Sequence, residues 1–523
     1  MSKKTRIILL VSIIAVASFL RLWQLNAIPP GLYPDVAING NDALDVINTH
    51  TPKVFFPENN GREGLFINLI ALSFIIFGPS IWAIKIVAAI IGILTVPGLY
   101  LLSKEIFRHT RFSEKQAETV SLLSAFFLTT SFWHIHFSRI GFRAICIPLI
   151  LVFSFYFLFK AFRTRRILPA VIGGGIFGLG FYTYTSFRFA VLLLLIVLIY
   201  WLVQCLKSRE TKTYLKLGSA FLIAVFVIAI PIGIYFLQHP SDFIGRAEGV
   251  SIFTKNNPVM AFGISVLTHL AMFNFKGDYN WRHNYSGQPM LPFLLGITFV
   301  LGLIYSAINL FKKKDTILHL FVFSGFLIML LPGMLTVESI PHSLRVVGVI
   351  PFVYFFAGLG SWKAYEFLSS NSQKKKIVIA CSIFFLVSIG VSEPKKYFYY
   401  WAENPEVKNA FSENYLLIGN YLNSLPDDVV KYVVVNLQGA AVPFPNGLPM
   451  PAQTPMFIER AKFGKIRATY IEPKDIKKIV AGNKKIAIIP LQIGSDISLK
   501  IYETLPVARI EINRDFWVYK INF

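Results

Sequence analysis

Long apolar runs alternate with short polar segments over the first three quarters of the chain, and this pattern predicts a bundle of membrane-spanning helices. A span needs roughly 20 mostly apolar residues, and eleven runs approach that length. They lie at 7–25, 81–103, 117–133, 144–162, 168–184, 187–206, 217–237, 291–311, 317–335, 346–362 and 377–392. Residues 1–392 are therefore predicted to form a polytopic α-helical membrane module.

One apolar segment, 65–77 (LFINLIALSFIIF), is too short for this pattern. If it crossed the membrane, the basic segment 104–115 would move to the opposite side and every later loop would invert. We interpret it as a helix that lies at the membrane interface or dips into it.

The pattern changes after residue 392, where short alternating runs replace the long apolar ones. Strands are predicted at 429–437, 466–471, 484–490 and 516–521, and helices at 411–424 and 473–480. The stretch 442–455 (VPFPNGLPMPAQTP) is predicted to be a proline-rich loop. Residues 393–523 are therefore expected to form a small α/β domain outside the membrane.

Composition and charge give this topology an orientation. The chain is 54% hydrophobic and 15% charged, whereas soluble domains carry about 25% charged residues. The segments on the side of the N-terminus hold 22 Lys and Arg in 55 residues, and the loops on the other side hold 10 in 136. Because basic residues concentrate in cytoplasmic loops, the N-terminus is predicted to be cytoplasmic, with the first outer loop (26–80) and residues 393–523 outside the cytoplasmic membrane. This asymmetry accounts for the basic net charge of +23 without a nucleic-acid partner.

Nine acidic residues of the membrane module lie in the outward loops and none lies in the middle of a span, which favours a site at that surface over a transport path through the spans. In the first outer loop, Asp35 follows Pro34 where helical spacing begins. Two interpretations remain open for Asp35. It caps a helix, or its carboxylate faces a substrate at the membrane surface.

Other candidate residues lie in the same outward loops. An anionic ligand at this surface, such as a phosphate, needs cationic partners, and the arginine fork binds such groups well. The candidates are Arg62, Arg139, Arg143, Arg188, Arg282 and Arg345, of which we favour Arg345 and Arg143. His134 and His136 would face one side of an extended segment. They could bind a divalent metal with Asp35 or Glu63, although we favour a role in orienting Asp35 or the phosphate. Glu63 pairs with Arg62 or lies across the site from Asp35. The polar, aromatic loop 274–289 suggests that Asp278 binds substrate, and Tyr182 closes the fifth span on the same side.

Several loop phrases together resemble one family. GLYPDVAINGNDAL and GREGLFIN in the first outer loop, WHIHFSRIGFRA at 133–144, GLGFYTYTSFRFA at 178–190 and HSLRVVGVIP at 342–351 are similar to the outer loops of bacterial relatives of the protein O-mannosyltransferases and the aminoarabinose lipid A transferases. These are C-type glycosyltransferases that use polyprenyl-phosphate sugars. The resemblance extends over about residues 7–360, and its specificity comes from the order and common sidedness of the phrases.

The resemblance implies a fold, a reaction and a base. It implies a C-type glycosyltransferase fold and the transfer of a sugar from a polyprenyl-phosphate donor at the outer face of the membrane. The family's first-loop Asp matches Asp35, which would take the proton from the acceptor. The Glu that usually follows is Val36 here, so a paired second carboxylate is missing. An inverting displacement needs only one positioned base, because the leaving group is already a phosphate.

Two other functions compete with this one: a flippase or transporter for lipid-linked sugars, and a noncatalytic scaffold of envelope assembly. A transporter would need polar residues along a path through the spans, and the spans show almost none. The sequence names neither the sugar nor the acceptor, which could be a lipid, a glycan or a protein. It indicates no certain cofactor, and a divalent metal is possible.

Overall fold

The computed structural model describes residues 2–208, 210–370, 372–440, 442 and 447–523. It divides into two compact units that do not follow the order of the chain. The helical unit comprises Met1–Trp23 and Ala88–Trp401, and the α/β unit comprises Gln24–Val87 and Ala402–Phe523. The first outer loop therefore shares a compact unit with the C-terminal part of the chain.

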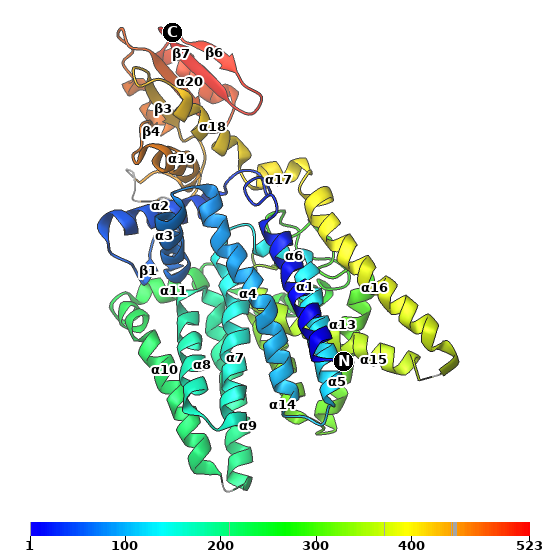
Figure 1. The fold of residues 1–523 in the computed structure, drawn as a ribbon. Helices are drawn as coiled ribbons and strands as arrows, with labels where there is room; N and C mark the ends of the chain where they lie inside the picture. Colours follow the sequence, from blue (N-terminus) through cyan, green and yellow to red (C-terminus); the bar gives the residue numbers. More distant parts are fainter. Residues whose placement is uncertain (1, 209, 371, 441, 443–446) are drawn as a thin grey trace. The chain divides into compact units, whose positions relative to one another are not determined.

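Long apolar helices account for most of the helical unit (Figure 1). Among the described residues, nine helical segments are long and apolar enough to cross a membrane. The long helices are α1 (Lys3–Leu22), α4 (Ile81–Phe107), α7 (Cys146–Thr164), α9 (Ala190–Ser208), α10 (Thr211–Gln238), α13 (Phe293–Phe311), α14 (Thr316–Met334), α15 (Ile350–Leu368) and α16 (Lys375–Lys395). Two shorter helices, α5 (Glu114–Thr130) and α8 (Ile167–Leu179), coincide with the remaining predicted spans. The chain is a multi-pass membrane protein.

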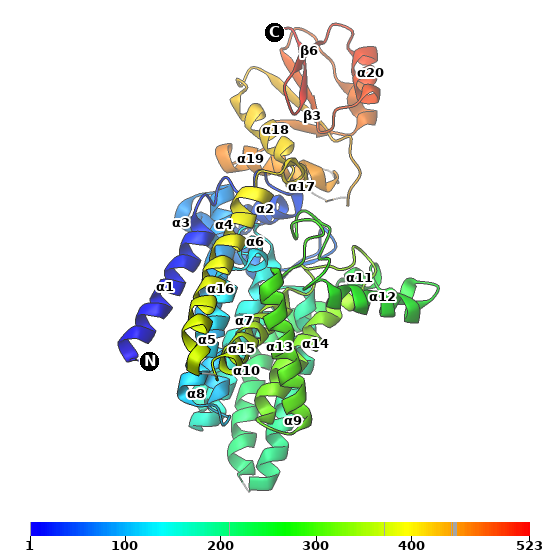
Figure 2. The same cartoon turned by 90° about the vertical axis from the view of Figure 1, so that its right-hand side faces the viewer.

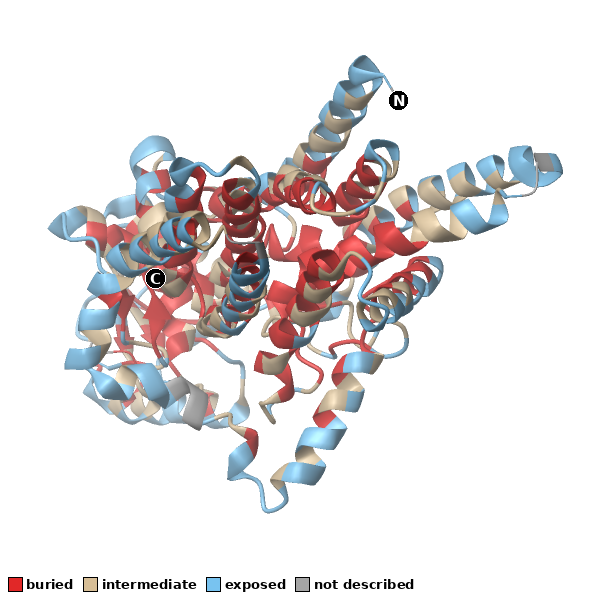
Figure 3. Ribbon diagram, turned by 90° about the horizontal axis from the view of Figure 1, so that it is seen from below, coloured by how far each residue is buried: buried red, intermediate tan, exposed pale blue. Residues whose placement is uncertain are grey.

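Buried residues concentrate on the inward faces of these helices, and the outer faces remain apolar and exposed (Figure 3). Apolar side chains are normally removed from water, so the exposed apolar faces fit contact with lipid. Small residues allow close crossings between the helices. A side chain at Gly174 of α8 would meet the backbone of Phe221 of α10, and one at Gly302 of α13 would meet the backbone of α15. The glycines of 173–180 therefore allow α8 to pack closely against α10.

Several short elements lie between the long helices. They are α6 (Phe132–Phe137), η1 (Arg143–Ile145), η2 (Gly180–Tyr182), η3 (Thr185–Phe189), α11 (Pro240–Glu248), η4 (Ile252–Thr254), α12 (Pro258–Ala271), η5 (Val347–Val349) and η6 (Ser372–Lys374). α11 and α12 run roughly across the direction of α13 and α14 (Figure 2). The sequence pattern placed no helix there, because 14 residues are too few for a span. α16 continues as the π-helix η7 (Lys396–Trp401), beyond the predicted end at residue 392.

The α/β unit contains a five-stranded sheet of order β4-β3-β5-β7-β6. β3 (Val430–Val434) is parallel to β4 (Thr469–Ile471) and β5 (Ile486–Pro490), while β7 (Trp517–Ile521) is antiparallel to β5 and β6 (Arg509–Ile512). α18 (Glu413–Ser424) and α19 (Gln453–Phe463) cover one face, and α20 (Ser495–Thr504) and η9 (Pro473–Lys478) cover the other. The predicted α/β fold is confirmed, with β6, α19 and α20 added.

The first outer loop supplies the rest of the α/β unit. It contains α2 (Pro34–Thr49), the hairpin of β1 (Phe55–Phe56) and β2 (Arg62–Glu63), and α3 (Leu65–Phe77). α3 is a helix of 13 residues, about 20 Å long and so shorter than the ~30 Å hydrocarbon core. α2 packs against α3 and α19. Two short elements complete the unit, α17 (Pro405–Ala410) and η8 (Met450–Ala452).

The predicted proline-rich loop 442–455 is shorter than expected. η8 occupies its later part, and α19 already begins at Gln453. Pro455 lies in the first turn of α19, where a missing N–H is tolerated. Residues 443–446 of this loop lie outside the described residues.

Candidate active site

Asp35 stands in the first turn of α2 and not at its cap. The N-cap residue is Tyr33, Pro34 is the first helical residue, and no side chain caps this end. The Asp35 carboxylate is half-buried, and its Oδ1 accepts a hydrogen bond of 3.1 Å from the Asn59 side chain. The capping interpretation is therefore wrong. The free N–H groups and dipole of the helix start favour a carboxylate here, and Asn59 orients it.

Arg62 and Glu63 are both buried in strand β2, with 1% and 2% of their surfaces exposed. Arg62 donates to Asn39 at 2.9 Å, lies 2.5 Å from the Asp42 carboxylate and donates through Nε to the Glu58 carbonyl at 3.2 Å. Successive side chains of a strand point to opposite faces, so Arg62 turns toward α2 and braces the first outer loop.

The two histidines of the His-x-His phrase lie in α6, a short helix, and not in an extended segment as expected. Two residues apart on a helix, they face different neighbours. His134 Nδ1 lies 2.6 Å from the Arg21 guanidinium, and His136 Nε2 lies 2.6 Å from the Arg282 carbonyl. Burial lowers the pKa of His136 to about 3, so this ring is neutral at physiological pH. Arg21 also makes the surroundings of His134 unfavourable for a metal cation.

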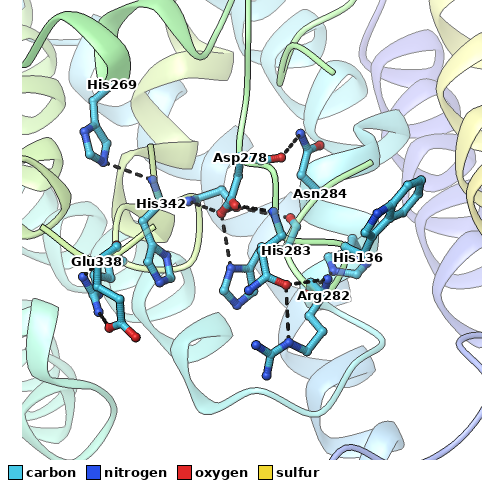
Figure 4. Close-up of polar contacts among 12 residues, drawn as sticks. His136, His269, Asp278, Arg282, His283, Asn284, Glu338 and His342 are labelled. Atoms are coloured by element: carbon cyan, nitrogen blue, oxygen red, sulfur yellow. Dashed lines mark hydrogen bonds and ion pairs between the residues drawn. The ribbon is translucent and has the colours of Figure 1, made fainter. Parts of the chain in front are cut away.

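Asp278 is the centre of a buried hydrogen-bond network (Figure 4). Its Oδ2 accepts from the backbone N–H and hydroxyl of Ser343 at 2.8 and 3.0 Å and lies 3.2 Å from His283 Nδ1. Its Oδ1 accepts from the Asn280 N–H at 2.8 Å. Burial by itself would raise the pKa of Asp278, but the His283 and backbone hydrogen bonds outweigh it and hold that pKa below its usual value. The carboxylate thus ties the loop 272–292 to the segment that carries Arg345.

Three of these side chains offer a possible metal site. Ligand atoms of Asp278, His283 and His342 lie within 4.8 Å of one another, and all three residues are buried. One carboxylate and two imidazoles form a common donor set for a divalent transition metal. However, the Asp278 oxygens already accept several hydrogen bonds, so an ion would have to displace the His283 N–H. The same carboxylate also acts as a structural tie through its hydrogen bonds to Ser343 and Asn280.

Arg345 and Arg143, the favoured phosphate ligands, both have Tyr184 as a neighbour. Arg345 lines a cavity of about 240 Å³ together with Tyr184. The Arg143 guanidinium lies 5.1 Å from the centre of the same Tyr184 ring. Arg345 also pairs with Glu338 at 2.5 Å. The remaining wall is mostly apolar and includes Phe189, Val250, Phe253, Pro332 and Leu335. An apolar cavity with a cation at its wall suits an anionic head on an apolar chain.

Tyr182 has a different position. Its hydroxyl donates to the Ile228 carbonyl at 2.7 Å and accepts from the Ile232 N–H at 3.3 Å. Pro231 lies within α10 and removes one backbone donor there, so Tyr182 steadies the interrupted helix.

Sequence reasoning missed His283, His342 and Ser343. His342 and Ser343 belong to the phrase HSLRVVGVIP, so the phrase contained them without indicating their roles. Nothing in the spacing shows that Ser343 meets Asp278, 65 residues earlier.

The comparisons with known proteins agree with the resemblance seen in the sequence. Residues 65–232 match the dolichyl-phosphate-mannose-protein mannosyltransferase family. No curated protein matches the chain. The fold is similar to the crystal structure of ArnT from Cupriavidus metallidurans bound to undecaprenyl phosphate, with a TM-score of 0.51, 13% identity, and 99% of this chain and 98% of that chain covered. For apo ArnT from the same organism the TM-score is 0.55 at 12% identity, with 100% and 99% covered.

These matches define the fold class as ArnT-like, a polytopic membrane fold with a C-terminal sheet domain. The expected C-type glycosyltransferase fold is therefore confirmed.

Proposed function

We propose that the protein is a glycosyltransferase that moves a sugar from a polyprenyl-phosphate carrier to an acceptor at the outer face of the cytoplasmic membrane, with its N-terminus in the cytoplasm. The observation that carries this proposal is the cavity lined by Arg345 and Tyr184, with the Arg143 guanidinium close to the Tyr184 ring. Its apolar wall would hold the start of the lipid, and the Arg345 guanidinium would bind the phosphate, with Arg143 next to the Tyr184 ring. The ArnT-like fold and the mannosyltransferase family match support this reaction class.

In the proposed mechanism Asp35 is the general base. It would take the proton from the acceptor hydroxyl or amine as that atom attacks C1 of the sugar. The bond from C1 to the phosphate oxygen would break on the opposite face, which inverts the anomeric centre. The developing phosphate charge would be stabilised by Arg345 and Arg143. Arg62, Glu63, His134, His136, Tyr182 and Asp278 would shape and hold the substrate site. No step is assigned to a metal.

The test is sugar release from a panel of radiolabelled polyprenyl-phosphate sugars in nanodiscs that contain a mixed acceptor extract. Wild type is compared with Asp35→Asn and with Asp242→Asn as a matched control. Asp242 also lies in the first turn of a helix that begins with proline, and it accepts a hydrogen bond from Tyr235 at 2.8 Å. A general base is worth roughly 10²–10⁴-fold, so Asp35→Asn should lose about that much turnover while Asp242→Asn keeps it.

Each other outcome has a definite meaning. Equal loss in both variants would reject Asp35 as the base, and retention of the anomeric configuration in the product would reject the single displacement. Failure of wild type to act on any donor in the panel would reject the proposed function.

A further inference from the structure

A second, polar cavity lies along α2 in the α/β unit. It has a volume of about 170 Å³ and is lined by residues of the first outer loop together with Val442 and Gln453 of the C-terminal part. Since one water needs about 10–15 Å³ of such a cavity, this cavity has room for several waters. It is therefore sized for a single ring or side chain and not for a whole lipid head.

The cavity follows the face of α2 that carries Asp35. The lining residues Ile38, Asp42, Asp45 and Thr49 continue from Asp35 at steps of three and four, which places them on one side of a helix. Glu58 lines the cavity and its neighbour Asn59 donates to Asp35. At 1.5 Å per residue, Asp42 lies about 10 Å along the helix from Asp35.

The charges at the cavity wall balance one another. Asp42 lies 2.5 Å from Arg62 Nη1, and Glu58 lies 3.8 Å from Arg62 Nη2. Asp45 lies 2.5 Å from Arg460.

Lys53 also lines the cavity, so the cavity wall carries one lysine beside three carboxylates that are paired with Arg62 or Arg460. A wall with balanced charges gives neither a free cation nor a free anion a net attraction. It still offers many hydrogen-bonding atoms to a neutral ligand.

The uncharged lining residues fit a hydroxyl-rich ligand. The Thr49 and Thr51 hydroxyls lie at the exposed end of α2 and 2.6 Å from each other. Phe56 adds an aromatic side chain to the wall. Planar carboxylate and amide groups beside an aromatic ring are a pattern suited to a sugar, whose hydroxyls need donors and acceptors and whose C–H face is apolar.

We infer that this cavity is an acceptor subsite for a neutral sugar residue, which makes the acceptor of the proposed reaction a glycan. The inference rests on the proposed function for the role of Asp35. The reacting hydroxyl would lie at Asp35 and the bound ring beside Asp42. A separation of about 10 Å along the helix exceeds one pyranose ring, so the acceptor would be a disaccharide or longer. The C-terminal part of the chain would thereby contribute Gln453 to acceptor binding.

The experiment uses full-length protein in nanodiscs and a panel of neutral oligosaccharides of two to four units as probes. Thr49→Trp places an indole at the exposed edge of the cavity. Asn48→Trp is the matched control, because Asn48 is the adjacent exposed residue of α2 and does not line the cavity. Probe binding is followed by saturation-transfer NMR and acceptor use by radiolabel transfer from the donor. We expect Thr49→Trp to lose the saturation-transfer signal and to raise the acceptor KM at least tenfold, while Asn48→Trp leaves both unchanged.

The outcomes separate this inference from the proposed function. If wild type releases sugar from a donor but Thr49→Trp binds and uses oligosaccharides as well as wild type does, the subsite is rejected and the transferase stands. Transfer to serine or threonine peptides, with no transfer to any oligosaccharide, also rejects it. If wild type uses no donor, the proposed function fails, and NMR binding that Thr49→Trp abolishes still supports the sugar site. A signal from cationic amines in place of neutral oligosaccharides rejects it.

Discussion

Asp45 and Arg460 form an ion pair, with 2.5 Å between Oδ1 and Nη2, although 415 residues separate them in the chain. Arg460 also donates to the Asn41 carbonyl at 3.1 Å, and it is only 7% exposed. Asn41 in turn donates to the Gln453 side chain at 2.9 Å. The first outer loop and the C-terminal part therefore share buried polar contacts, and α19 helps to hold the helix that carries Asp35.

Removal of Arg460 should loosen α2. Arg460→Met deletes its ion pair and its hydrogen bond to Asn41, leaving a buried carbonyl without its donor. We expect the free energy of local unfolding of α2 to fall by about 1–3 kcal/mol, and by less where the half-exposed Asp45 side chain is already screened by solvent. Hydrogen exchange of α2 and α19 in nanodiscs measures this free energy. The control is Lys485→Met, whose exposed pair with Asp428 at 3.0 Å should matter little. Equal protection of α2 in Arg460→Met and wild type would show that α19 does not hold α2.

Asp278 should make stability depend on acid pH. Its pKa in the folded protein lies below the ordinary value, so its contribution is fully present above about pH 4 and is lost as the pH falls through the folded pKa. We expect the thermal midpoint of Asp278→Asn to lie below that of wild type at pH 7 and the difference to shrink as the pH approaches 3. Scanning fluorimetry in detergent follows this. A difference that stays constant over that range would contradict the hydrogen-bonded carboxylate.

The sequence predicts the membrane helices well, because each span needs a long apolar run that is visible locally. Each predicted span contains or overlaps a helix, and the segment 65–77 forms one that is too short to span. Strand β5 was equally clear, since its five residues are all apolar and buried on both faces. β3 was also predicted, although Lys431 interrupts its apolar run. The local sequence pattern is enough to predict an element whose surroundings, lipid or a buried core, are the same along its whole length.

The candidate site could be predicted only in part, because its contacts join distant segments. Asp35 at the start of a helix and Arg345 at the start of another follow from the sequence. The pairing of Asp45 with Arg460 does not, since α19 carries both apolar and charged residues and its start falls in a proline-rich stretch. His134 and His136 were expected on one side of an extended segment. A six-residue helix separates them, because Ser131 accepts from the His134 N–H at 3.2 Å and starts a turn.

Substitutions of Arg345 and of Glu338 should change the KM for the donor in opposite directions. Arg345→Gln removes a guanidinium from the proposed phosphate site, and we expect the KM for a polyprenyl-phosphate sugar to rise by about 10–100-fold, since a charge-assisted hydrogen bond is worth about 1.5–3 kcal/mol. Arg345→Lys should recover only part of this, because an ammonium lacks the planar fork.

Glu338→Gln leaves Arg345 in place and removes its anionic neighbour, whose side chain is 62% exposed. An exposed pair is worth about 0–1 kcal/mol, so the donor KM should fall by up to about fivefold. Donor-dependent initial rates in nanodiscs measure all three variants. If Glu338→Gln raises the donor KM as much as Arg345→Gln does, the Arg345–Glu338 pair only positions its own loop, and the phosphate binds elsewhere.

His136 should not determine the acid limb of the pH–rate profile. Burial lowers its pKa to about 3, so the ring stays neutral over the range in which the enzyme would be assayed. His136→Gln retains a side-chain N–H for the Arg282 carbonyl, and we expect the acid limb of kcat/KM to keep its midpoint even if the rate falls. Because kcat/KM reports the ionisations of the free enzyme, that limb would then belong to another group. A midpoint that moves in His136→Gln would instead make the histidine the titrating group.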